Sequence, residues 1–121
     1  MLKALIAGTL AAIWCASAAQ AQSAVYTWTG YGTNPPGSSK CPTYKMVIDV
    51  TVDGASVKGR FQQEGRPERS FEATLGSNGA IKTTAVVGGG GKMDVIGQIK
   101  EGDSKIKLDG YCIFEGPLTK K

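Results

Sequence analysis

The stretch YKMVIDVTVDGASVKGRF, residues 44–61, decides the fold that the sequence predicts. Its first half alternates apolar with polar or charged residues, and Val47 is the one apolar residue on the outward side. The inward positions are Tyr44, Met46, Ile48, Val50 and Val52. A period of two is typical of a strand with one buried face. Asp53-Gly54 fits a tight hairpin turn, after which Val57, Gly59 and Phe61 continue the same face.

The same pattern continues along the rest of the chain, and helical periodicity is missing. The further strands that we expect are residues 25–29, 71–75, 81–87, 93–99, 106–108 and 111–118. Asp109-Gly110 is a second tight-turn signal, and Pro117 predicts that the last strand frays or lies at an edge from that point. Eight short strands joined by hairpins predict a small antiparallel up-and-down β-barrel, with a two-sheet β-sandwich as the alternative. We expect Trp28 to fill one end of the barrel and apolar side chains to fill its interior.

Residues 1–21 have the features of a secretory signal peptide. Lys3 is followed by an apolar run over residues 4–16 and by the A-x-A cleavage pattern of residues 19–21. The run is too short to span a bilayer. Removal of residues 1–21 from the 121 leaves 100, so we expect a single β domain over residues 22–121. We expect Sec export to the bacterial periplasm or out of the cell.

The cysteine count depends on that signal peptide. Cys15 leaves with it, and the pair that remains, Cys41 and Cys112, is expected to form a disulfide in an oxidising compartment. Such a bridge would join the segment before the second strand to the last strand, which favours a closed ring of strands. An alternative is that Cys15 is a lipidated first residue, although lipidation prefers a small residue where Trp14 stands.

Composition excludes several kinds of catalysis. The chain has no histidine, so histidine acid–base chemistry and the commonest zinc ligand are absent. Gly88–Gly91 followed by Lys92 does not match the phosphate-binding loop, and no calcium-loop motif is present. A hydrolase with paired carboxylates is a weaker alternative, since most acids fall in turns or on outward faces. We therefore expect a protein without catalytic activity, cofactor or metal.

The net charge is +4, and +3 after Lys3 is removed. Basic residues are spread between acidic ones rather than clustered, which does not favour nucleic-acid binding. We expect a monomer without a membrane span that binds a protein or a small ligand.

The candidate binding surface combines one loop with one charged hairpin. Residues 33–42 predict an irregular loop rich in proline and glycine, flanked by tyrosines that suit recognition. All three arginines of the chain fall within residues 60–72, and two of them lie near the predicted loop tip, where they suit an anionic ligand or partner. The candidate rim is Tyr31, Asn34, Lys40, Tyr44, Arg66 and Arg69.

Two resemblances extend these expectations. Residues 26–30, Tyr-Thr-Trp-Thr-Gly, loosely resemble the opening strand of small calycin-like barrels. One disulfide in an exported domain of roughly 100 residues is similar to bacterial periplasmic inhibitors of metalloproteases, from whose pattern a cysteine in the final strand departs. The likeness covers architecture alone and transfers no residue role. We expect an exported binding protein, with a protease inhibitor or a structural envelope or stress protein as alternatives.

Overall fold

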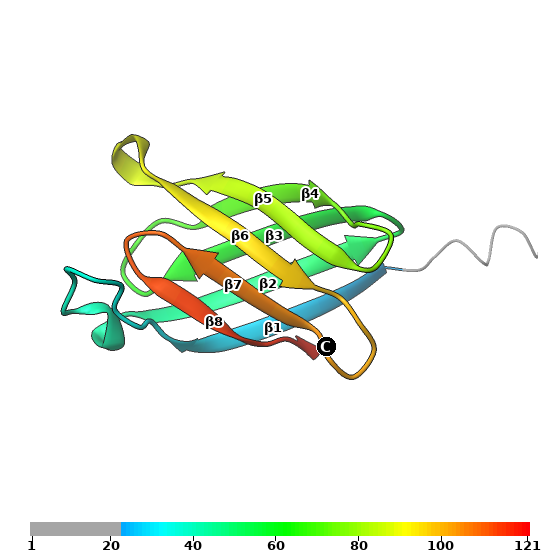
Figure 1. Ribbon diagram of the computed structural model, residues 1–121, viewed down its shortest axis with the longest axis horizontal. Helices are drawn as coiled ribbons and strands as arrows, with labels where there is room; N and C mark the ends of the chain where they lie inside the picture. The colour runs from blue at the N-terminus through cyan, green and yellow to red at the C-terminus, as the bar shows by residue number, and fades with distance from the viewer. Residues whose placement is uncertain (1–22) are drawn as a thin grey trace, which may run out of the picture.

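The computed structural model describes residues 23–121, which form antiparallel strands and two short 3₁₀ turns (Figure 1). The predicted signal peptide, residues 1–21, lies outside the described residues. The strands are β1 (Ser23–Tyr31), β2 (Lys45–Asp53), β3 (Ser56–Gln63), β4 (Arg69–Thr74), β5 (Ala80–Val86), β6 (Lys92–Gln98), β7 (Lys105–Asp109), β8 (Ile113–Pro117) and β9 (Thr119–Lys120). The 3₁₀ turns are η1 (Cys41–Thr43) and η2 (Gly88–Gly90).

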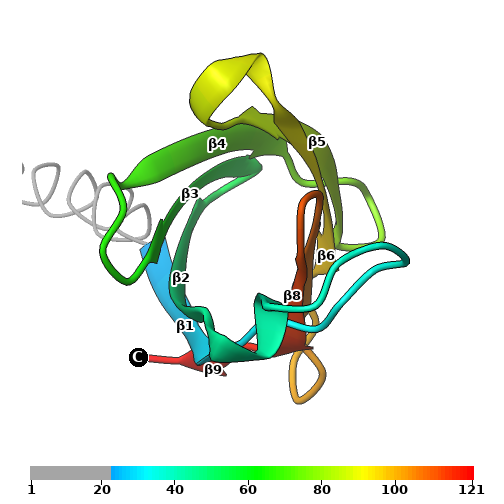
Figure 2. The same ribbon diagram turned by 90° about the vertical axis from the view of Figure 1, so that its left-hand side faces the viewer.

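The strands form two sheets that face each other (Figure 2). One has five strands in the order β4-β3-β2-β1-β9, and the other has four in the order β5-β6-β7-β8. Every pairing is antiparallel. The predicted all-β class and hairpin order are therefore confirmed.

The closed barrel that we expected is wrong, and the two-sheet sandwich fits instead. Within residues 23–121 no ladder joins β4 to β5, and β8 meets the segment after β1 only through an isolated bridge between Thr33 and Ile113. The Trp28 indole on β1 lies against Gly116 on β8, where a Cβ atom would overlap it. Trp28 thus fills the seam between the two sheets and not, as expected, one end.

Two turns differ by one or two residues from their prediction. Asp53 pairs with Ser56, so the β2–β3 turn is centred on Gly54 and Ala55, with Gly54 at φ 63°. Asp109 pairs with Ile113, so residues 110–112 form a three-residue turn. The last strand therefore begins at Ile113 instead of residue 111, and Cys112 lies in the turn before it.

The predicted last strand is divided between the sheets. Pro117 ends β8, which is an edge strand, as the missing N–H of proline predicted. The chain then passes through the buried Leu118, and β9 pairs with Tyr26 and Thr27 of β1 in the opposite sheet. This crossing ties the two sheets together at one seam.

The core fills the space between the sheets, as expected. Its fully buried side chains come from both inner faces and include Met46, Ile48, Met93, Leu108 and Phe114. Gly59 lies inward in the middle of β3 because the ring of Phe71 occupies the volume that a Cβ atom would need.

The predicted disulfide joins Cys41 of η1 to Cys112 in the β7–β8 turn, with a Cα–Cα distance of 5.6 Å and a sequence separation of 71 residues. Both cysteines are buried. The bridge fastens the long loop between β1 and β2 to a turn of the opposite sheet. Among residues 23–121, no helix has the length and apolar character that crossing a bilayer requires.

We predict that the double variant Cys41→Ala, Cys112→Ala unfolds more easily. Closing a loop of 71 residues restricts the unfolded chain, so its loss should lower the free energy of unfolding by about 2–4 kcal/mol. Urea unfolding followed by tryptophan fluorescence measures this change. Wild-type protein reduced with dithiothreitol should match the variant, and an unchanged unfolding midpoint in both would contradict the prediction.

Candidate ligand-binding site

One end of the sandwich carries the connections of residues 32–44, 64–68, 87–91 and 110–112 (Figure 1). A cavity of about 420 Å³ lies between the sheets at this end. We call it the end cavity. Its lining residues are Met46, Phe61, Gln63, Arg66, Pro67, Arg69, Val87, Gly88, Gly91, Lys92 and Tyr111.

The end cavity lies where the inner face of the five-stranded sheet changes from apolar to polar. Across the strands, Met46 pairs with Gln63 and Phe61 pairs with Arg69. Met46 and Phe61 are almost completely covered and close the floor. Gln63 and Arg69 point inward at the next positions because they continue the alternation of β3 and β4. The strand register therefore places an amide and a guanidinium above an apolar floor.

Local hydrogen bonds fix the loop that carries Arg66. The Gln62 side chain donates from Nε2 to the carbonyl oxygen of Arg66 at 2.8 Å, and the Arg66 backbone N–H donates to the carbonyl oxygen of Gln63 at 2.9 Å. Arg69 reaches toward the opposite sheet, where a Cβ atom on Gly88 would lie 3.0 Å from its Nη2. The glycine at this position leaves room for the guanidinium group.

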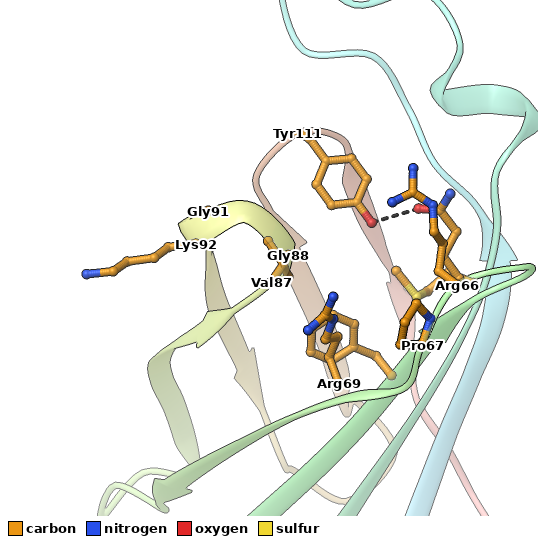
Figure 3. Close-up of a pocket in the computed structure, with 11 residues that line it drawn as sticks. Arg66, Pro67, Arg69, Val87, Gly88, Gly91, Lys92 and Tyr111 are labelled. Atoms are coloured by element: carbon orange, nitrogen blue, oxygen red, sulfur yellow. Dashed lines mark hydrogen bonds between the residues drawn. The ribbon is translucent and has the colours of Figure 1, made fainter.

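Tyr111 forms the opposite wall (Figure 3). Its hydroxyl donates a hydrogen bond of 2.7 Å to Oε1 of Gln63, which joins the two sheets at the mouth of the end cavity. Its ring meets the ring of Phe114 edge-on, with 6.1 Å between centroids. The neighbouring disulfide at Cys112 fixes the turn from which Tyr111 projects.

Burial raises the pKa of Tyr111 above its ordinary value of 10.0. The positive charges of Arg66 and Arg69 act in the opposite direction, and Tyr44 adds to the increase. Tyr111 is therefore a neutral hydrogen-bond donor at physiological pH and does not act as a base.

The charges around the end cavity are all of one sign. Its lining includes Arg66, Arg69 and Lys92 but no carboxylate, and Figure 3 shows that the Lys92 ammonium points away. The ion pairs found within residues 23–121 join Asp49 to Arg60 and Lys121, and Lys107 to Asp109. Neither Arg66 nor Arg69 has an acidic partner there. Two guanidinium groups of this kind can hold an anion through charge-assisted hydrogen bonds.

The structure separates the predicted rim into two groups. Arg66 and Arg69 line the end cavity, and Tyr44 packs partly buried against the core close to Tyr111. The other three, Tyr31, Asn34 and Lys40, lie at the same end but do not line it.

Those three positions belong to the loop between β1 and β2. Tyr31 is 57% exposed at the end of β1. The Asn34 side chain accepts a hydrogen bond of 3.0 Å from the Cys41 backbone N–H, and the Lys40 carbonyl accepts one of 2.9 Å from Thr43. For Asn34 the hydrogen bond is a structural contact that orders the loop.

Sequence reasoning missed Gln63 and Tyr111. The pattern in residues 44–61 predicts inward positions only as far as Phe61, although the alternation of Val57, Gly59 and Phe61 extends to Gln63. Tyr111 was assigned to a strand because the turn was expected to hold two residues. Its neighbour Cys112 was a usable signal, since a bridge to Cys41 brings Tyr111 to the end where Tyr44 lies.

Comparison of the chain with protein-family models, curated proteins and solved structures finds no match. The resemblance to calycin-like barrels does not extend to closure, because the two sheets do not form a barrel, and the resemblance to periplasmic inhibitors stays a prediction. The role of the end cavity is argued from its own residues. Within residues 23–121, no group of three or more acidic or cysteine side chains could hold a metal ion.

We predict that Tyr111 makes stability depend on alkaline pH. Because folding raises its pKa, its contribution is complete below pH 10 and is lost as the pH rises through the folded value. The variant Tyr111→Phe should lack this part of the decline and the matching tyrosinate absorbance at 295 nm. The control Tyr31→Phe also removes one phenol, but it should keep both features. Identical alkaline profiles for Tyr111→Phe and wild type would refute the assignment.

Proposed function

We propose that this protein is an exported binding protein that holds a small anionic ligand in the end cavity and does not catalyse a reaction. The observation that carries the proposal is the convergence of Arg66 and Arg69 on a cavity without an acidic partner among the described residues. Because both guanidinium groups line the end cavity without an ion pair among the described residues, their N–H donors are available to a bound anion.

The third arginine is a useful contrast. Arg60 lies only six positions before Arg66, but it points outward and lies 3.8 Å from the Asp49 carboxylate. Its charge is therefore partly compensated by an acidic neighbour on the adjacent strand, as is common for exposed pairs. Arg66 and Arg69 differ from it because they line the end cavity and form no ion pair within residues 23–121, which supports a role in binding and not only in surface solvation.

The composition of the end cavity supports binding without catalysis. Its polar groups are the amide of Gln63, the hydroxyl of Tyr111 and cationic side chains. The raised pKa of Tyr111 keeps its proton in place, so the hydroxyl orients Gln63 and does not attack a substrate. Arginine does not give up its proton near neutral pH, and so it positions an anion without taking part in proton transfer.

Export is part of the proposal as well. The signal-like residues 1–21 and the buried disulfide both suit an oxidising compartment outside the cytoplasm. The inhibitor and the envelope-protein alternatives stay predictions.

We predict that wild-type protein purified gently from its compartment carries a small molecule that native mass spectrometry detects as added mass. The double variant Arg66→Gln, Arg69→Gln should lose this mass, because each charge-assisted hydrogen bond removed weakens binding by about tenfold or more. Circular dichroism should show an unchanged fold.

The matched control is Arg60→Gln, which removes the same side chain from the outer face of β3 and should keep the added mass. Loss of the mass in Arg60→Gln as strongly as in the double variant would mean that net charge, and not the end cavity, is responsible. Retention of the mass in the double variant would contradict the proposal.

A further inference from the structure

We propose that the ligand is a compact organic carboxylate, with its charged group between Arg66 and Arg69 and an aromatic or branched apolar body against Val87, Pro67 and the ring of Tyr111. This inference rests on the proposed function and adds the chemical class of the ligand. It is carried by the distribution of polar and apolar surface inside the end cavity.

The two arginines set the nature of the charged group. A guanidinium group presents paired N–H donors in one plane, which match the two oxygens of a carboxylate. The positions of Arg66 and Arg69 are fixed from different elements, the first by the hydrogen-bonded loop after β3 and the second by the register of β4 with β3. Both side chains line the end cavity, so an anion bound there could accept hydrogen bonds from two different elements.

The side walls of the end cavity indicate which uncharged group the ligand carries. Pro67 and Val87 contribute apolar surface from opposite sheets, and the hydroxyl of Tyr111 is already occupied by Gln63, so its ring remains as contact surface. Tyr111 is 45% exposed, so its ring is accessible to a ligand from solvent. An apolar group of the ligand would gain contacts with this ring, Pro67 and Val87, whereas an inorganic anion would gain no apolar contact.

The closed floor of the end cavity limits the size of the ligand. Met46 is 0% exposed and Phe61 is 2% exposed, so the core below is closed and leaves no channel between the sheets. A volume of about 420 Å³ lies at the lower end of the range usual for small-molecule sites. A long acyl chain would have to remain in solvent, whereas a single ring or a short branched chain would be covered.

The test compares four probes on the exported, oxidised protein by isothermal titration calorimetry. These are 3-phenylpropanoate, its neutral isostere 3-phenylpropanamide, inorganic phosphate and decanoate. We expect 3-phenylpropanoate to bind at least tenfold more tightly than the amide and phosphate, and decanoate to bind no more tightly than 3-phenylpropanoate. Arg69→Gln should weaken 3-phenylpropanoate at least tenfold, and Arg60→Gln should leave it unchanged.

A second readout locates the bound anion without relying on affinity. A carboxylate next to Tyr111 should move its alkaline absorbance change at 295 nm to higher pH, because a nearby negative charge disfavours the phenolate. The Tyr111→Phe variant should lack this shift. Binding without any shift would place the carboxylate elsewhere and overturn the inference.

The remaining outcomes separate this inference from the proposed function. Tighter binding of phosphate, decanoate or the amide at Arg66 and Arg69 would overturn the ligand class and leave the end cavity as the binding site. If no probe binds while the co-purified mass still depends on both arginines, the ligand class is wrong and the proposed function stands. If neither the probes nor the co-purified mass depend on the arginines, both fail.

Discussion

The covalent link between Cys41 and Cys112 is the constraint on which the functional end of this protein depends. The chain crosses between the two sheets twice, through residues 75–79 from β4 to β5 and through Leu118 from β8 to β9. At the loop end the disulfide also connects the two sheets, because it links the irregular segment after β1 to the β7–β8 turn. Without it, the turn that carries Tyr111 would be held by hydrogen bonds near the surface, which contribute about 1 kcal/mol each.

The end cavity results from a compromise between packing and polarity. Elsewhere the inner faces meet through apolar side chains that are fully buried, such as Ile48, Val95 and Leu108. At the loop end, Gln63 and Arg69 take the equivalent positions on the inner face. Gln63 is buried and accepts the hydrogen bond of Tyr111 from the opposite sheet, which satisfies its amide oxygen. An apolar core that continued to the loop end would stabilise the fold further, but it would leave no end cavity.

The alternation of apolar and polar residues predicted the strands well. It predicted poorly whether these strands close into a barrel. The alternation in residues 44–61 depends only on neighbouring positions, so β2 and β3 appear where expected, with their turn one residue later than predicted. Whether eight strands close into a ring depends on a few contacts at the seams, such as Trp28 on Gly116, that leave no periodic trace in the chain. The length of the β7–β8 turn was also not evident from the pattern. One extra residue after Asp109 moved Tyr111 from a predicted strand into the wall of the end cavity.

The charge of the site shows most clearly why composition alone could not reveal it. Residues 60–72 contain three arginines and three glutamates, a balance that indicates a neutral, solvated hairpin. Folding separates these charges. Glu64 lies beside Val47 and Gln62 on the outer face of the five-stranded sheet, whereas Arg69 lies on the inner face because it is paired with the inward-facing Phe61. Since adjacent strand positions face opposite sides of a sheet, a register shift of one residue would exchange the two faces. The position of the Arg69 guanidinium in the lining of the end cavity is therefore a property of strand register and not of residue content.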